Sequence, residues 1–171
     1  MDMEYKYFEG LKSGFEYREE IKLNFERGTF IMPTQVENGY NATYDELKNT
    51  SSDANYWNNR ARMVSPISVA EREQITIIIP THLRMAYKFW KKNKTPVEHI
   101  THDSGWVEHN GIFKLTIPEG VGYLSIHVSL SDDSEFDLSE TKDIKLIKEK
   151  TIATIRIQNP NAPIFGKGGR L

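Results

Sequence analysis

Apolar and polar residues alternate with a period of two over most of the chain after its first segment. Ile21, Leu23 and Phe25 are separated by polar residues, and the same alternation runs through Tyr123–Ser129. Successive side chains of a strand point to opposite faces, so this period predicts half-buried β-strands. The strand that starts at Ile21 is expected to continue at Thr29–Ile31 past a glycine bulge at Gly28. Further strands are expected at Ala61–Val64, Ile67–Val69, Gln74–Ile79, Met85–Trp90, Val97–Ile100, Phe113–Ile117, Asp143–Lys148 and Ile152–Ile157. Short strands without a strand–helix–strand rhythm predict a mostly β fold, an antiparallel, jelly-roll-like β-sandwich.

Two connections stand out between these strands. The aromatic arm Met85–Trp90 ends in the polar tip Lys91–Lys94, and Val97–Ile100 is then expected to pair with the arm. The polar stretch Pro33–Asn59 is long for a loop in a compact domain, and such loops are usually functional. Within it, Tyr44–Lys48 is compatible with a short helical turn.

Residues 1–20 depart from the period of two. Apolar residues recur at helical spacing from Tyr5 to Phe15, and the charged, helix-prone run Glu16–Glu20 follows. Glycines interrupt the spacing, and each costs a helix interior about 1 kcal/mol, so short helical turns or a loosely ordered leader are expected. After Asn159 the chain is rich in Pro and Gly, as linkers are. The expected organisation is an N-terminal helical or irregular arm (1–20), a β-sandwich domain (21–158) and a linker-like C-terminal tail (159–171).

Composition narrows the class of partner. The chain has 171 residues and a formal net charge of −2, which gives no electrostatic reason to expect nucleic acid or an anionic membrane as a partner. No stretch approaches the roughly 20 apolar residues of a membrane-spanning helix. The chain lacks cysteine, which excludes disulfides and Cys-ligated zinc and favours a bacterial or viral origin.

No catalytic motif is recognisable in the sequence. A nucleophile elbow, a P-loop, a dinucleotide fingerprint and a zinc-protease helix are all missing. The 24 acidic residues allow many carboxylate pairs for glycoside hydrolysis, but nothing selects one pair. The chain is therefore expected not to be an enzyme and to carry no catalytic residue.

A loop rich in rings and amides leads into the predicted strand at Ala61. The loop and the start of the strand offer rings, amides and arginines within a short stretch: Tyr56, Trp57, Asn58, Asn59, Arg60 and Arg62. Sugar recognition needs an apolar surface for the C–H groups of the sugar and polar groups for its hydroxyls, and this loop supplies both. The alternative is that the rings pack on the sandwich while an arginine bridges two strands or pairs with a carboxylate.

Two further tryptophans are candidate ligand-binding residues. Alternation in the aromatic arm places Trp90 on the face opposite Phe89, so a buried Phe89 would make Trp90 a surface platform for stacking. Trp106 follows a glycine and is interpreted first as a rim residue that closes the core. The expected ligand-binding set is thus the ring-and-amide loop, with Arg60 and Arg62, together with Trp90 and Trp106.

Two clusters of titratable residues are candidate metal ligands. Three histidines stand around Trp106 in the sequence: His99, His102 and His109. Their spacing matches no familiar site, and exposed loop histidines are the favoured interpretation. The acidic run Asp132–Asp137 offers oxygen ligands of the kind that calcium prefers, but it lacks the EF-hand pattern. A solvated acidic turn is the favoured interpretation, so no cofactor is expected beyond this calcium alternative.

Five short motifs follow one another between about Ala54 and Ser131. They are an N-R-x-R strand entry (Asn59–Arg62), an I-T-I strand (Ile75–Ile77), an aromatic strand (Tyr87–Trp90), a G-W dipeptide (Gly105–Trp106) and a P-x-G…Y-L-x-I finish (Pro118–Ile126). Their order resembles that of jelly-roll modules in bacteriophage tail and receptor-binding proteins, over less than half of the chain. The resemblance implies a carbohydrate-binding-like sandwich used for cell-surface attachment or as structural decoration of a tail. It supplies no catalytic residues.

These observations together predict a non-enzymatic β-sandwich module of a phage tail or tail fibre that attaches to a host-surface glycan. Its partners would be other tail or fibre subunits and a host cell-surface glycan, and it would act as a homo-oligomer. Its expected location is the virion tail, or otherwise the extracellular space or a bacterial surface. Two alternatives stay open: a purely structural virion protein that contacts neighbouring subunits, and a non-catalytic accessory domain of a secreted polysaccharide-degrading enzyme.

Overall fold

The computed structural model describes residues 15–31, 33, 36–48, 58–98 and 106–152. Backbone contacts divide the chain into two compact units, one made of residues 18–150 and the other of residues 1–17 and 151–171. Only the strand ends 15–17 and 151–152 of the second unit are among the described residues, so the architecture below is that of the first unit. None of the helices in the described ranges has the length and apolar character that a membrane crossing needs.

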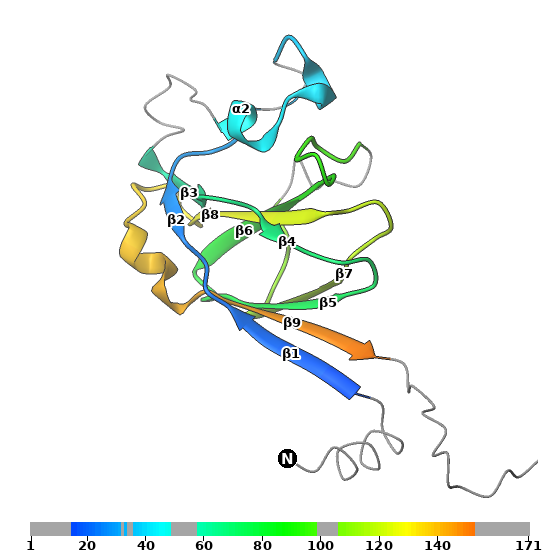
Figure 1. The fold of residues 1–171 in the computed structure, drawn as a ribbon. Coiled ribbons are helices and arrows are strands. Elements are labelled where there is room, and N and C mark those ends of the chain that lie inside the picture. The colour runs from blue at the N-terminus through cyan, green and yellow to red at the C-terminus, as the bar shows by residue number, and fades with distance from the viewer. Residues whose placement is uncertain (1–14, 32, 34–35, 49–57, 99–105, 153–171) are drawn as a thin grey trace, which may run out of the picture. The chain divides into compact units, whose positions relative to one another are not determined.

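The described strands form two antiparallel sheets (Figure 1). Sheet A has the order β1 (Phe15–Ile21), β9 (Lys145–Ile152), β5 (Gln74–Ile78) and β7 (Ile112–Thr116). Sheet B has the order β2 (Phe25–Arg27), β3 (Arg60–Met63), β8 (Tyr123–Leu130) and β4 (Ile67–Ser68), and β6 (Leu83–Trp90) pairs along the whole of β8. The predicted mostly β, sandwich-like fold class is therefore confirmed.

The two sheets bury a common apolar core through the alternation that the sequence predicted. Leu124, Ile126 and Val128 of β8 are fully buried. They belong to one hydrophobic cluster with Ile75 and Ile77 of β5, a strand of the other sheet. Full burial of a side chain of this size stabilises a fold by about 1.5–3 kcal/mol. One face of each sheet thus packs into the core, and the opposite face of each sheet points away from it.

A second, smaller apolar cluster lies on the outer face of sheet B, around Trp90. After β2 the chain forms η2 (Gly39–Asn41) and α2 (Tyr44–Lys48), and Figure 1 shows α2 beyond β3 and β8. We call the described residues of 28–48 the covering segment. Four of its residues pack with Trp90: Phe30, Ala42, Tyr44 and Leu47. The covering segment thus closes one end of this face to solvent.

Hydrogen bonds fix the conformation and the position of the covering segment. α2, which the sequence indicated, begins with a capping box. In it, the Glu46 carboxylate accepts hydrogen bonds from the backbone N–H (2.6 Å) and the hydroxyl (2.9 Å) of Thr43. The hydroxyl of Tyr44 donates to the backbone carbonyl of Met63 in β3. The helix is therefore both capped at its start and tied to sheet B.

The hairpin tip after β6 forms where the sequence predicted it. The backbone N–H of Lys94 donates to the carbonyl of Lys91 (2.9 Å), and Lys94 has a positive φ of 63°. The N–H of Val97 then donates to the carbonyl of Phe89 (3.1 Å). The expected contact of this segment with the aromatic arm is thus present as one isolated bridge, between Trp90 and Pro96, but Val97 and Glu98 form no strand. Ile100 lies outside the described residues.

Glu16–Glu20, predicted to be part of a helical or irregular arm, instead belongs to β1 at the edge of sheet A. Charged side chains suit an edge strand because they stay in water and discourage pairing with other chains. Two ion pairs join β1 to β9, Arg18 with Glu149 (3.5 Å) and Glu20 with Lys145 (3.8 Å). A dense run of charges therefore did not distinguish a helix from an exposed edge strand.

Strand boundaries differ from the prediction at other places too. The strand predicted through Ile21, Leu23 and Phe25 is interrupted, because β1 ends at Ile21 and β2 begins at Phe25 in the other sheet. Thr29–Ile31 does not continue the preceding strand, because Gly28 has a φ of 130° and turns the chain away from β2. The strands predicted at Asp143–Lys148 and Ile152–Ile157 are one continuous strand up to Ile152, and later residues lie outside the described ranges. The 3-10 helix η3 (Leu138–Asp143) was not predicted.

Candidate functional site

Beyond the covering segment, the outer face of sheet B carries a row of polar and cationic side chains. Ser125, His127 and Ser129 of β8 point to this face because they alternate with residues of the core. The strand register places Arg60 of β3 and Arg84 of β6 directly opposite Ser129. Two arginines from different strands therefore flank one serine on the same face.

Trp106 lies against this row. The backbone N–H of Val107 donates to the carbonyl of Met85 (2.8 Å), which holds Trp106 close to the neighbouring Arg84. The guanidinium carbon of Arg84 lies 4.7 Å from the centroid of the Trp106 ring. That of Arg60 lies 5.2 Å from the same centroid. The ring is only partly buried, so it combines contacts to two cations with access to solvent.

His127 adds a further contact to the Trp106 ring. The two ring centroids lie 5.5 Å apart with an angle of 67° between the planes, an edge-to-face arrangement. A cation–π contact contributes about 0.5–1 kcal/mol at an exposed position, so these contacts orient the ring more than they stabilise the fold. We define the arginine–tryptophan site as Arg60, Arg84, Trp106, His127 and Ser129.

Arg84 is fixed by two partners. Its Nε and Nη2 atoms donate to the hydroxyl oxygen of Ser129 (3.3 and 3.1 Å), and Nη2 also contacts the carboxylate of Asp133. The Arg84 side chain is 24% exposed. Its Nη1 atom donates no hydrogen bond to the residues that the structure describes, and neither does the indole N–H of Trp106. The site therefore offers both N–H groups to a ligand.

Arg62, predicted to contact a ligand, has a structural role. Its side chain is 3% exposed, and Nε donates to the Glu26 carboxylate at 3.2 Å. Its Nη1 atom donates to the carbonyl of Thr29, and the Lys48 ammonium lies 2.8 Å from the same Glu26 oxygen. Burial lowers the pKa of Arg62 and Glu26 opposes this, so the guanidinium remains charged. Arg62 ties the covering segment to sheet B and has no exposed surface for a ligand.

Trp90 is buried, and the prediction that it faces the surface is wrong. It is 0% exposed, while Phe89, its neighbour in β6, is 3% exposed. The indole N–H of Trp90 donates to the hydroxyl of Ser125 (2.8 Å), and the ring packs edge-on against Tyr44, with centroids 4.9 Å apart. Alternation predicts that one face of β6 is buried, but the covering segment also buries the Trp90 end of the other face.

The predicted ring-and-amide loop is described only from Asn58 onwards. Tyr56 and Trp57 lie outside the described residues, so their contact with a ligand stays a prediction. The Asn58 side chain is exposed. The side-chain oxygen of Asn59 is buried and accepts no hydrogen bond from the described residues. These amides adjoin Arg60 in the chain, so the part of the loop that is described leads into the arginine–tryptophan site.

The predicted histidine cluster can be assessed only at His109, because His99 and His102 lie outside the described residues. The Nε2 atom of His109 donates to the carbonyl of Leu83 (2.8 Å), and its Nδ1 atom accepts from the backbone N–H of Gly111 (3.3 Å). This pattern requires the neutral tautomer with the proton on Nε2. Both ring nitrogens are thus engaged in holding the backbone.

The carboxylates of the acidic run Asp132–Asp137 have partners within the protein. Asp133 and Glu135 pair with arginines. Asp137 accepts a hydrogen bond from the backbone N–H of Ser139 (2.9 Å), which lowers the pKa of Asp137. Across the described ranges, no group of three His, Cys, Asp or Glu residues is arranged to hold a metal ion. The calcium alternative gains no support from this turn.

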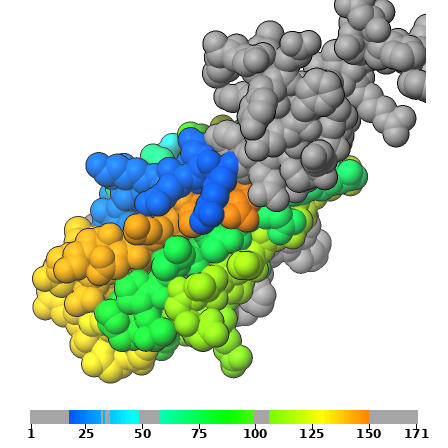
Figure 2. All heavy atoms as spheres, turned by 90° about the horizontal axis from the view of Figure 1, so that it is seen from below, coloured from blue at the N-terminus to red at the C-terminus, as the bar shows by residue number. Residues whose placement is uncertain are grey.

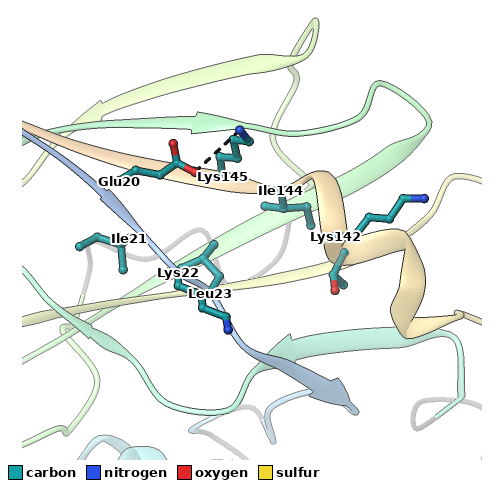
Figure 3. Close-up of a pocket in the computed structure, with 8 residues that line it drawn as sticks. Glu20, Ile21, Lys22, Leu23, Lys142, Ile144 and Lys145 are labelled. Atoms are coloured by element: carbon teal, nitrogen blue, oxygen red, sulfur yellow. Dashed lines mark ion pairs between the residues drawn. The ribbon is translucent and has the colours of Figure 1, made fainter.

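A separate pocket of about 400 Å³ lies between the end of β1 and the residues from the end of η3 to the start of β9 (Figure 3). Its lining combines lysines with aliphatic side chains: Glu20, Ile21, Lys22, Leu23, Thr141, Lys142, Ile144 and Lys145. Glu20 and Lys145 form an ion pair there (3.8 Å), which the dashed line in Figure 3 marks. This lining contains no aromatic ring, so the arginine–tryptophan site is the stronger candidate for recognition of a ligand.

Arg84 and His127 were not among the residues predicted to bind a ligand. The alternation of β8 does place His127 on the face opposite Ile126, so its outward direction could have been deduced. Its position between Arg62 of β3 and Ala86 of β6 could not, because that depends on which strands pair with β8.

Comparison with models of protein families, with curated proteins and with solved structures gave no match. The resemblance of the motif order to phage tail modules therefore stays a prediction from the sequence. The functional interpretation that follows depends on the contacts, exposure and charges of the arginine–tryptophan site, together with that prediction.

Proposed function

We propose that this chain is a non-enzymatic β-sandwich module of a phage tail or tail fibre, whose arginine–tryptophan site attaches to a glycan on the host surface. The observation that carries this proposal is the partly exposed Trp106 ring beside Arg84, with N–H groups on both that bond to no described residue. Glycan recognition uses aromatic surface for apolar C–H groups and N–H donors for oxygen atoms. This face of sheet B supplies both kinds of contact.

A binding role suits these residues better than catalysis does. Two described carboxylates contact arginines of this face. Glu26 pairs with Arg62, and Asp133 pairs with Arg84. These carboxylates are therefore engaged in holding the arginines in position rather than placed to act on a substrate.

Attachment through one small site is expected to be weak for a single chain. Presentation of several copies in one particle raises the overall affinity by about 10²–10⁴-fold without any new contact. A module of a tail or tail fibre would act in this way, as one of several identical subunits. The location in a virion is supported by the order of the sequence motifs, and the glycan by the residues of the site.

A purely structural role in the same kind of particle is the second candidate, favoured by a different face. Ile78 of β5 and Ile112 of β7 lie opposite each other in sheet A and are 36% and 52% exposed. Figure 2 shows this side of sheet A, with β9 in orange, β5 in green and β7 in yellow-green. Adjacent exposed apolar side chains often mark protein contacts, so this face would meet a neighbouring subunit.

A glycan array tests the proposal, with the purified chain presented both as a monomer and as a multivalent display. Binding to a bacterial cell-wall or capsular glycan that is lost in Trp106→Ala would support attachment through this site. Because Trp106 is partly exposed, the variant is expected to stay folded. A folded chain that binds no bacterial glycan in either format would refute the proposal and favour the structural candidate.

A further inference from the structure

We infer that the glycan bound at the arginine–tryptophan site is acidic, and that Arg84 contacts a carboxylate or phosphate group of the sugar. This inference rests on the proposed glycan-binding function and names the class of sugar that the site selects. Three features of the site carry it: the charge of the underlying strands, the hydrogen bonds of Arg84, and the cations that lie against the Trp106 ring.

Positive charge is concentrated on the outer face of sheet B. The strands β3, β6 and β8 contain no aspartate or glutamate. Their cationic side chains on this face are Arg60, Arg62, Arg84 and Lys88. Glu26 and Asp133, which pair with two of these arginines, come from outside the three strands. The whole chain has a formal net charge of −2, so the positive character is local and favours anions at this face.

Arg84 keeps a donor available for an anion. A guanidinium that lies against an aromatic ring uses its flat face, so its N–H groups stay in the plane for hydrogen bonds. Ser129 occupies the Nε and Nη2 atoms of Arg84, and Nη1 bonds to no described residue. Carboxylate and phosphate oxygens form the strongest hydrogen bonds with guanidinium groups. A ligand oxygen can therefore bind Nη1 while Ser129 continues to hold the arginine.

The surroundings of the Trp106 ring favour charged over neutral sugars. A neutral sugar depends on an open aromatic face for its C–H groups. Here the guanidinium carbons of Arg60 and Arg84 lie 5.2 and 4.7 Å from the ring centroid and cover part of the aromatic surface. Recognition is therefore expected to depend on charge more than on stacking, with the indole N–H as an additional donor.

Asp133 gives a second way to test the role of charge. Its carboxylate contacts Nη2 of Arg84 and is 55% exposed, so it competes with a ligand anion for the same guanidinium. Asp133→Asn removes the charge and keeps the shape, and should raise the affinity for the acidic glycan about threefold, as expected for a screened pair. Arg84→Gln should lower that affinity about tenfold or more, through loss of a charged hydrogen bond.

The experiment uses the full chain in multivalent display on bacterial surface polysaccharides arranged in matched pairs. One pair compares a carboxylate-bearing polysaccharide with its carboxyl-reduced form, and another compares a phosphate-bearing polysaccharide with its dephosphorylated form. Arg84→Gln, Arg84→Lys and Asp133→Asn are measured beside the original chain. Arg72→Gln is the matched control, because Arg72 is 87% exposed and lies outside the arginine–tryptophan site.

Retention of an acidic member with at least about tenfold weaker binding of its neutral counterpart is the expected result. Arg84→Gln should lose that preference, Arg84→Lys should keep part of it, and Arg72→Gln should leave it unchanged. The two pairs show whether a carboxylate or a phosphate is recognised. Equal binding of acidic and neutral members would overturn the inference and leave the glycan function intact. Binding to no member by a folded chain would overturn both.

Discussion

The guanidinium carbon of Arg84 lies 4.7 Å from the centroid of the Trp106 ring, on the part of sheet B that the covering segment leaves open. Each partner is held separately. Arg84 Nη2 donates to Ser129 (3.1 Å), and the residue after Trp106, Val107, donates its N–H to the carbonyl of Met85 (2.8 Å). A pair fixed in this way loses little conformational freedom when a ligand binds. The proposed function depends on this preorganised pair.

Trp90→Ala should cost far more stability than Trp106→Ala, while Trp106→Ala should impair glycan binding. Trp90 is fully buried, and replacement of a buried tryptophan by alanine costs about 3–5 kcal/mol of unfolding free energy. Trp106 is partly exposed, and its loss should cost only about 1–2 kcal/mol in cation–π contacts while weakening glycan retention. Urea unfolding and glycan binding of both variants check this. Equal destabilisation would show that Trp106 is a core residue.

Glu26→Gln should loosen the covering segment. The Glu26 carboxylate is 34% exposed and contacts Arg62 Nε (3.2 Å) and Lys48 Nζ (2.8 Å), and a neutral amide cannot balance these cations. We expect a loss of about 1–2 kcal/mol, below the 3–5 kcal/mol of a fully buried pair, because solvent screens part of the interaction. Glu135→Gln, which breaks an exposed pair with Arg27, should cost about 0–1 kcal/mol. Chemical denaturation that finds no difference between the two would contradict this role of Glu26.

Gly122→Ala should strain the pairing of β6 with β8. A Cβ atom at Gly122 would lie 2.9 Å from the Cα and N atoms of Lys92. The N–H of Gly122 also donates to the carbonyl of Trp90 (2.8 Å), so the backbone has little room to move. Overpacking of this kind costs about 1–3 kcal/mol of unfolding free energy.

Gly120→Asn is the control for that variant. Gly120 has a φ of 82° and no atom within 4 Å of an added Cβ. Asparagine tolerates positive φ better than most residues, so the control should cost less than about 1 kcal/mol. Thermal unfolding distinguishes the two variants, and a larger loss in Gly120→Asn would mean that the close approach of Lys92 is not what limits position 122.

Part of the acid sensitivity of the fold should come from Asp137. The Ser139 N–H at the start of η3 holds the pKa of Asp137 below its ordinary value. Such a carboxyl stabilises the fold above its unfolded pKa of about 3.9, and this contribution is lost as the pH falls through the lower, folded pKa. Asp137→Asn keeps a side-chain acceptor but does not titrate. Its thermal midpoint should therefore fall less than that of the original chain between about pH 5 and about pH 3, and an equal fall would exclude this contribution.

The sequence predicted most of the inner strands because alternation is a local property. In β8, Leu124, Ile126 and Val128 are buried as their spacing requires. The same rule failed for Trp90, because residues far away in the chain cover the outer face of β6 at its Trp90 end. It also failed at Glu16–Glu20, where an edge strand and a charged helix have similar composition.

The candidate site was predictable in part. Trp106 and Arg60 were selected by residue type and are in contact in the structure. Arg84 and His127 were missed, because their proximity to Trp106 follows from the pairing of β6 with β8 and from the bridge between Val107 and Met85 of β6. The local pattern of residues does not determine which strands pair, so contacts between side chains of different strands could be found only in the structure.

The indole N–H resonance of Trp106, followed during titration with a bacterial surface polysaccharide, tests the proposed site most directly. The chain has 3 tryptophans, so single Trp→Phe variants assign each indole signal in a proton–nitrogen correlation spectrum. Binding at the arginine–tryptophan site should cause a saturable shift of the Trp106 signal, while the signal of Trp90, whose indole N–H is bonded to Ser125, stays in place. Saturable binding that leaves the Trp106 signal unmoved would show that the polysaccharide does not bind at this site.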